Sequence, residues 1–284
     1  MNGFSDRPLA YVRLPARAPE AAVRFAEEMF GLERVEGADF ALRADERRQS
    51  LVFCGQDMAP AVGVEFADEA ALAGVVERLR AAGNACEALD AQACASRRIR
   101  QGLVTRAPSG GVIELVVRVE ISARRFYPGR DSGVCGLSAV GLRSRDVARD
   151  LAFWTDLVGA EISDRVGDIV YLRLDRAHHR IALYPSEGDG LLYVGFAVRT
   201  HDDLMRNAYF LQEQQVRIVH GPGCEAASGR MFVRFLAPDG QVFALDFSEA
   251  DDVPGRRPRQ FALDRYALCA WGSRCADLPE LAAA

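Results

Sequence analysis

The sequence predicts an α+β fold of four units, each with one strand, one helix and three further strands, arranged as two tandem domains. The first observation behind this prediction is an internal repeat. A shift of 128 residues aligns residues 9–33 with residues 137–161, and seven of the 25 paired positions are identical. Near the end of each half, APSGGVIELVV (residues 107–117) matches APDGQVFALDF (residues 237–247). Two homologous halves explain both matches.

The second observation is a one-sided apolar stripe near the start of each half. The first stripe follows Pro19, which suits a first helical turn, and the second follows Asp146, a suitable N-cap. Gly31 and Gly159 end the two predicted helices. The apolar positions with helical spacing are Ala22, Phe25, Ala26, Met29 and Phe30 in the first half and Val147, Leu151, Trp154 and Val158 in the second.

The third observation is that strand and helix patterns recur within each half. Residues 168–174 and 180–185 are rich in β-branched and aromatic residues, which is typical of strands. A second strand and helix follow in each half, and Thr200 with Asp203 forms a capping box before the helix of the second half. Residues 122–136 contain Pro and Gly without periodicity and are the predicted linker. We therefore expect domains at residues 1–121 and 137–284.

Composition excludes several classes of function. The 284 residues carry a net charge of -5, so nucleic acid and acidic membrane surfaces are poor candidate partners. The start of the chain lacks the layout of a signal peptide and no apolar run could span a bilayer, so we expect a cytoplasmic protein. All 35 basic residues are Arg, which excludes Schiff-base chemistry on lysine. The seven scattered cysteines indicate reduced thiols.

The paired units and the P-[SD]-G turn closing each half resemble the vicinal oxygen chelate superfamily, which includes glyoxalases, bleomycin-resistance proteins and type I extradiol dioxygenases. The segments LAFWTDLVGAEISD and RAHHRIAL are most similar to the two-domain 2,3-dihydroxybiphenyl dioxygenases. The resemblance implies cup-shaped mixed sheets, with the active or binding site in the C-terminal cup. The tail, residues 248–284, is predicted to begin as an exposed connector. Trp271 is predicted to anchor the segment that follows on the core.

The resemblance implies an Fe(II) site of two His and one Glu, and this site is where the match fails. The three equivalent positions are Ala139, Tyr193 and Ala244. Neither alanine can bind a metal, and one tyrosine cannot hold a divalent ion alone. In the first half the corresponding residues are Tyr11, Ala61 and Glu114, and Glu114 is better explained as a partner of an arginine. The sequence therefore predicts no metal and no organic cofactor.

Other residues of the predicted cup could act on a substrate. The resemblance places His179 where the dioxygenases carry a proton-handling histidine, and Arg234 and Glu225 replace two pocket residues. Tyr193 could donate to a developing oxyanion, Arg234 could hold an anion, and Glu225 with Arg180 could contact the substrate. A satisfied core histidine, a solvated arginine and a space-filling tyrosine are the alternatives. His178 and His179 are expected to be adjacent on a strand and so to point to opposite faces, and a histidine metal site is therefore not expected.

Three functions fit these residues. The main prediction is a metal-independent enzyme that uses acid–base chemistry, as an isomerase, lyase, decarboxylase or hydrolase, on a small aromatic or ring-derived anion. The first alternative is an Fe(II) extradiol ring-cleavage dioxygenase, if the ligand positions are matched wrongly. The second is a small-molecule binding protein of the bleomycin-resistance type. In each case the partner is a small molecule, and a homo-oligomer is possible.

Overall fold

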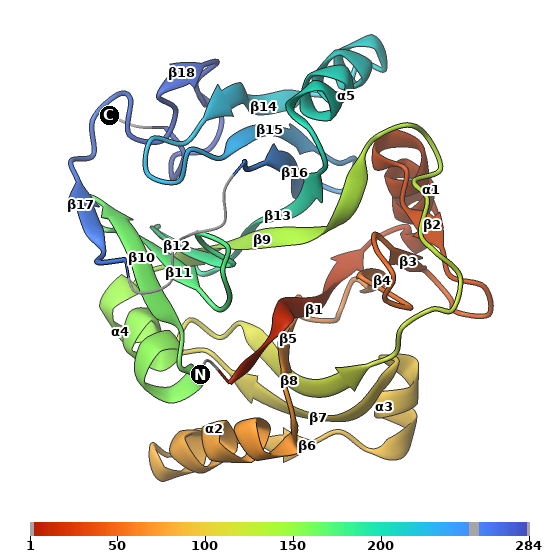
Figure 1. Cartoon of the computed structure of the whole chain (residues 1–284), viewed down its shortest axis with the longest axis vertical. Coiled ribbons are helices and arrows are strands. Elements are labelled where there is room, and N and C mark those ends of the chain that lie inside the picture. The colour runs from red at the N-terminus through yellow and green to blue at the C-terminus, as the bar shows by residue number, and fades with distance from the viewer. Residues whose placement is uncertain (1–2, 250–255, 283–284) are drawn as a thin grey trace.

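The computed structural model describes residues 3–249 and 256–282, and it confirms an α+β fold with two mixed sheets. The first sheet has the strand order β2-β3-β4-β1-β5-β8-β7-β6, and the second has the order β17-β10-β11-β12-β9-β13-β16-β15-β14-β18. In each sheet the inner strands of two consecutive units pair with one another. The two sheets curl around separate interiors and meet along β1 and β9 (Figure 1).

The four predicted units are present, together with one additional short helix in the first half and two additional short strands in the tail. The elements of the first half are β1 (Phe4–Ala16), α1 (Pro19–Phe30), β2 (Glu33–Arg34), β3 (Ala41–Arg43), β4 (Leu51–Gly55), β5 (Ala61–Phe66), α2 (Glu69–Ala81), β6 (Glu87–Ala88), α3 (Ala91–Ser96), β7 (Ile99–Arg106) and β8 (Val112–Val119). Those of the second half are β9 (Val134–Ser144), α4 (Val147–Ala152), the π-helical turn η1 (Phe153–Val158), β10 (Glu161–Val166), β11 (Ile169–Arg173), β12 (Ile181–Pro185), β13 (Gly190–Val198), α5 (His201–Glu213), β14 (Ile218–Cys224), β15 (Met231–Leu236) and β16 (Val242–Phe247). The tail adds β17 (Arg259–Phe261) and β18 (Trp271–Gly272).

The predicted helix boundaries are confirmed by their hydrogen bonds. The Asp146 carboxylate accepts from the Arg149 amide at 3.0 Å, and the Thr200 hydroxyl accepts from the Asp203 amide at 3.0 Å. Gly31 ends α1 with φ of 70°, in the left-handed region that favours glycine. One boundary differs, because β9 begins at Val134, inside the segment expected to be the linker.

An aromatic cluster joins the two halves. Phe30, at the end of α1, is fully buried against rings of the second sheet. Its ring centroid lies 5.4 Å from Phe196, 5.7 Å from Phe235 and 5.1 Å from Phe243. The first repeat thus contributes a side chain to the core of the second half, and this burial holds the two sheets together.

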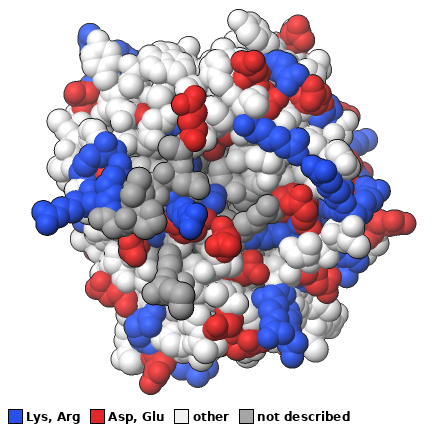
Figure 2. Space-filling view, in the orientation of Figure 1, with Lys and Arg blue, Asp and Glu red and all other residues white. Residues whose placement is uncertain are grey.

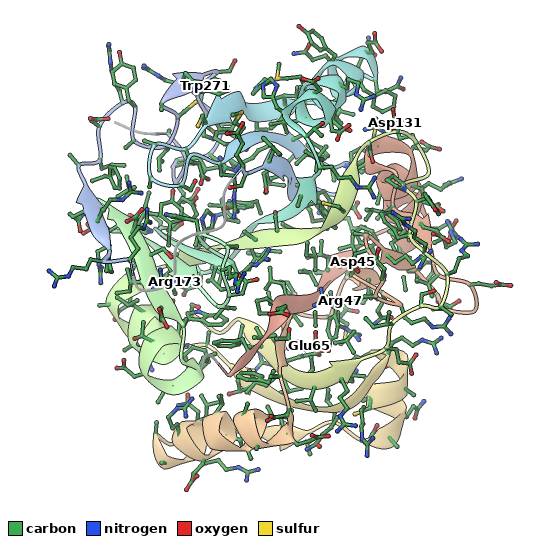
Figure 3. The ribbon with its side chains drawn as sticks, in the orientation of Figure 1. Asp45, Arg47, Glu65, Asp131, Arg173 and Trp271 are labelled. Atoms are coloured by element: carbon green, nitrogen blue, oxygen red, sulfur yellow. The ribbon has the colours of Figure 1, made fainter. Side chains whose placement is uncertain are left out.

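A second junction is polar and lies near the crossing of β1 and β9. Arg47 is buried, donates to the Leu9 carbonyl at 2.8 Å and pairs with Glu65 at 3.1 Å. Asp45 lies beside Arg47 between the two sheets (Figure 3). The Asp45 carboxylate also approaches Gly136, since a Cβ at that position would lie 3.1 Å from Asp45 Oδ2. The approach of Asp45 to Gly136 joins the two halves, whereas Arg47 binds Leu9 and Glu65 within the first half.

The tail packs back onto the second half. Ala267, Leu268, Cys275 and Leu281 are buried in one cluster with the interior side chains of the second sheet. The prediction that Trp271 anchors this segment is wrong: Trp271 is 48% exposed and lies at the outer edge of the molecule (Figure 3). The smaller side chains on either side of it make the buried contacts. Residues 250–255 of the predicted connector lie outside the described residues.

The part of the chain that the structure describes contains no helix long and apolar enough to cross a bilayer. Acidic and basic side chains are intermingled over the face drawn in Figure 2. That distribution accords with the small net charge of the sequence.

Candidate functional site

The second cup is the concave interior formed by β9, β13, β16 and β15. In this sheet Tyr193 pairs with Gly141, and Ala244 pairs with both Gly195 and Arg234. The Tyr193 ring lies against Gly141, where a Cβ would overlap the ring carbons. A glycine is therefore required at position 141 for the tyrosine to lie flat on the neighbouring strand.

Arg234 occupies the centre of this cup. Its guanidinium carbon lies 4.7 Å from the ring centroid of Tyr193 and 4.1 Å from that of Phe232. Arg234 also donates to Glu225 at 2.7 Å and contacts His220 Nδ1 at 3.0 Å. Arg234 and Glu225 are each 2% exposed, so this ion pair is almost completely removed from water. The guanidinium is thus held between two rings and neutralised by one carboxylate.

A chain of hydrogen bonds passes beside this pair through two histidines. His178 Nε2 lies 2.9 Å from Asp164, the two Nδ1 atoms of His178 and His179 are 3.0 Å apart, and His179 Nε2 lies 3.1 Å from Arg230. Arg230 can only donate and ionised Asp164 can only accept. Two neutral imidazoles therefore satisfy every contact, with His179 donating from Nδ1 to His178. The lone pair of His179 Nε2 accepts from Arg230, as it would in a satisfied core histidine.

This arrangement corrects the prediction that the two histidines lie on a strand. They lie in the loop between β11 and β12, and their rings contact one another instead of pointing to opposite faces. Two residues of the tail extend this chain of hydrogen bonds, because Arg256 and Arg259 donate to Asp164 at 2.9 and 2.7 Å. Burial raises the pKa of Asp164, but the hydrogen bonds from Arg259 and His178 outweigh burial and lower this pKa to about 2.

The buried imidazoles have low pKa values. Burial, followed by the charge of Arg230, lowers the pKa of His179 well below its ordinary value. Burial and the charge of Arg234 lower the pKa of His220 to about 2. Burial also lowers the pKa of His178, although Asp164 acts in the opposite direction. All three histidines are therefore neutral near pH 7.

Acid is expected to destabilise the protein from about pH 6.5 downward. Below about pH 6.5 the unfolded chain binds protons on His179 and His220, whereas the folded chain does not. The free energy of unfolding is therefore highest above this pH and decreases as the pH falls. Each of the two contributes roughly 1.4 kcal/mol per pH unit. Asp246, whose pKa burial raises, opposes this loss, but it is one group against the three histidines whose pKa values are lowered. Urea unfolding at pH 7.5, 6.0 and 5.0 measures the slope.

Four of the five predicted site residues lie together. Glu225 Oε2 is 4.0 Å from His179 Nε2, and Glu225 also binds Arg234, which lies over Tyr193. Arg180 is not part of this group, because it binds Asp175 and the carbonyls of Leu137 and Ser138. The functional roles of the five predicted site residues remain predictions. The sequence analysis did not predict Arg230, Tyr171 or Tyr184 as site residues. It also did not predict Asp164 and Asp246, although these two lie in the segments LAFWTDLVGAEISD and APDGQVFALDF.

The first cup contains an equivalent group. The Tyr11 hydroxyl donates to Glu114 at 2.6 Å, and Arg97 binds both oxygens of Glu114 at 2.8 Å. This confirms that Glu114 is a partner of an arginine. The Tyr11 ring lies against Gly63 on the neighbouring strand, as Tyr193 lies against Gly141 in the second cup. Both cups are thus filled by a tyrosine over a glycine and by a buried Glu–Arg pair.

Comparison with known proteins finds a family match in the second half of the chain. The model of the Glyoxalase/Bleomycin resistance protein/Dioxygenase superfamily matches residues 136–245. The matched segment contains the second cup. It is 27% identical over 226 residues to an iron-dependent extradiol dioxygenase of Rhodococcus jostii, which covers 71% of this chain and 75% of the relative.

Two solved structures of this superfamily share the fold over nearly the whole chain. A halotolerant catechol dioxygenase gives a TM-score of 0.88 with 19% identity and covers 97% of each chain. The 2,2',3-trihydroxybiphenyl 1,2-dioxygenase of Sphingomonas wittichii strain RW1 gives a TM-score of 0.80 with 21% identity, covering 95% of this chain and all of that one. At these identities the likeness establishes the fold.

The comparisons contradict the main functional prediction. That prediction was a metal-independent isomerase, lyase, decarboxylase or hydrolase. The relatives are extradiol dioxygenases instead, and one of them is named as iron-dependent. The findings favour the ring-cleavage class that was the first alternative. The prediction was wrong because it derived a reaction from the missing ligands alone, and missing ligands do not define another chemistry.

The residues of this cup nevertheless do not fit iron or manganese. The structure places Tyr193, Ala244 and Ala139 on the adjoining strands β13, β16 and β9, and two of these three side chains have no donor atom. Within residues 3–249 and 256–282, no three His, Cys, Asp or Glu side chains are grouped so that they could hold a metal ion. Divalent iron requires imidazole and carboxylate donors with open positions. No catalytic step through a metal is therefore derived from these residues.

Proposed function

We propose that this chain acts on an aromatic vicinal diol, as a member of the extradiol dioxygenase group with its site in the second cup. The observation that carries the proposal is the match over 226 residues to an iron-dependent extradiol dioxygenase. The two solved dioxygenases with the same fold add support. Because these relatives are enzymes, they also support an enzyme here, with ring cleavage as the favoured reaction class.

The polar atoms of the cup support a ligand with adjacent hydroxyl groups. The Tyr193 hydroxyl, His220 Nε2 and Arg234 Nε are buried and make no hydrogen bond within the described residues. All three belong to the group around Arg234. A buried polar atom without a partner costs about 1–3 kcal/mol, so a ligand that satisfies these atoms gains that energy on binding. Two neighbouring hydroxyls can both donate and accept.

Access to this group requires the tail to move. Tyr193 and Arg234 are each 2% exposed, and the tail residues Ala267 and Leu268 pack in the same interior cluster as Tyr193. The contacts of Arg256 and Arg259 with Asp164 fasten the tail beside the two histidines. Because Tyr193 and Arg234 are buried, a diol reaches them only when side chains that cover them move.

Binding of catechol and 2,3-dihydroxybiphenyl, measured by calorimetry, tests the proposal. We expect saturable binding of both, with at least tenfold weaker binding of phenol, which has one hydroxyl. Tyr193→Phe should weaken diol binding about 5- to 30-fold, since roughly 1–2 kcal/mol of hydrogen bonding is lost. Tyr209→Phe, at a side chain that is 65% exposed, is the matched control and should change nothing. Failure of every diol to bind would exclude this substrate class.

Diol binding without cleavage is a second candidate, and the donor set of Ala139, Tyr193 and Ala244 specifically favours it. Oxygen consumption separates the two candidates. The purified chain is supplied with Fe(II) or Mn(II) and with catechol in air. Oxygen uptake in proportion to added diol supports ring cleavage, whereas binding with no uptake supports a binding protein.

A further inference from the structure

Three observations concern the cation at the centre of the second cup. The first is the position of Arg234. It pairs directly across the sheet with Ala244, and its guanidinium lies 4.7 Å from the ring centroid of Tyr193. Ala244 and Tyr193 are two of the three positions at which the resemblance predicts metal ligands. A cationic side chain thus occupies the neighbourhood that a divalent ion would need.

The second observation is charge. Arg234 is paired with Glu225 at 2.7 Å, and Arg230 lies 3.8 Å from Asp246. Each of these two guanidinium groups in the cup therefore has one carboxylate as its partner, and neither carboxylate is available to bind a metal ion without losing its arginine. Arginine keeps its proton in proteins, so its charge cannot be removed to admit a metal ion. A divalent cation would meet repulsion from Arg234 and would have to compete with it for Glu225.

The third observation is the likeness of the two cups. The first has a tyrosine over Gly63 and the pair of Glu114 with Arg97. The second has a tyrosine over Gly141 and the pair of Glu225 with Arg234. The tyrosines come from non-equivalent strands, β1 in the first half and β13 in the second, so the likeness is not a simple consequence of the sequence repeat. Both interiors are closed by the same combination of groups.

We infer that the second cup uses the guanidinium of Arg234, paired with Glu225, as its permanent cation and takes up no divalent metal ion. The inference is independent of the diol proposal, because a cup without a metal can still bind a diol. If the inference holds, diol binding without cleavage is favoured over ring cleavage as the function of this cup, because no metal would be held at Ala139, Tyr193 and Ala244.

Crystals soaked in manganese chloride test the inference directly. We expect no anomalous peak within the second cup, and a peak within bonding distance of Tyr193 or Glu225 would overturn it. Peaks on surface carboxylates do not bear on the cup, since the map locates each ion. Diol binding is measured separately on metal-free protein, so the two proposals fail independently.

A gain-of-binding variant provides a second readout in solution. Ala139→His, Tyr193→His, Ala244→Glu and Arg234→Gln combined supply three ligands and remove the guanidinium. We expect this variant to bind one Mn(II) per chain by electron paramagnetic resonance, and the matched variant that keeps Arg234 to bind at least tenfold more weakly. Equal binding by the two variants would contradict the role given to Arg234. If the variants do not fold, the soaked wild-type crystals decide.

Discussion

Arg234→Gln is expected to lower the free energy of unfolding by about 3–5 kcal/mol. The substitution leaves Glu225 buried without its cation, and it also removes the stacking on Tyr193 and Phe232. A charge that is 2% exposed cannot recover its hydration without opening the cup. Urea unfolding at pH 7.5, followed by circular dichroism, measures the loss.

A double-mutant cycle isolates the ion pair. Arg234→Gln together with Glu225→Gln should cost less than the sum of the two single changes, because the double variant buries no unpaired charge. Arg34→Gln is the matched control, since Arg34 and its partner Glu20 are 40% and 52% exposed, and it should cost less than about 1 kcal/mol. If Arg234→Gln costs no more than this control, the pair does not stabilise the fold and Arg234 is free to serve a ligand.

Phe30→Ala is expected to cost about 3–5 kcal/mol and to uncouple the two halves. Phe30 is fully buried, and its ring contacts Phe196, Phe235 and Phe243 across the junction of the sheets. Truncation leaves a cavity in that aromatic cluster and removes the largest apolar contact of α1 with the second half. Chemical unfolding should therefore change from one transition to two, one for each half.

The control for Phe30 is an aromatic side chain that is not packed. Tyr127 is 66% exposed, and Tyr127→Ala should change the unfolding free energy by less than about 0.5 kcal/mol. Limited proteolysis gives an independent readout: cleavage between residues 122 and 133 should accelerate in Phe30→Ala and stay unchanged in Tyr127→Ala. A single unfolding transition with wild-type proteolysis would show that contacts other than those of Phe30 hold the halves together.

Local signals in the sequence predicted the elements well because their causes are local. Asp146 and Thr200 cap helices through atoms three residues away, and Gly31 ends α1 by adopting a backbone that other residues avoid. The apolar stripe containing Phe30 predicted a buried helix face. It could not predict which sheet that face contacts, and Phe30 packs against the other half of the chain.

Part of the candidate site was predicted from the resemblance. Resemblance brought His179, Tyr193, Arg234 and Glu225 into one group, and the structure places them together. The partners that determine their chemistry are distant in sequence. Arg230 engages His179 from 51 residues away, and Asp164 receives Arg259 from 95 residues away. No spacing rule connects such residues.

By itself, the sequence determined the α+β class and the duplication into four units, because these follow from periodicity and residue identity. The assignment of the metal-ligand positions to Ala139, Tyr193 and Ala244 came from the resemblance and stays a prediction. The tertiary structure alone decided what fills the cup. It placed Arg234 over the ring of Tyr193 and packed the tail residues Ala267 and Leu268 into the same interior, since these contacts join segments that are far apart in the chain.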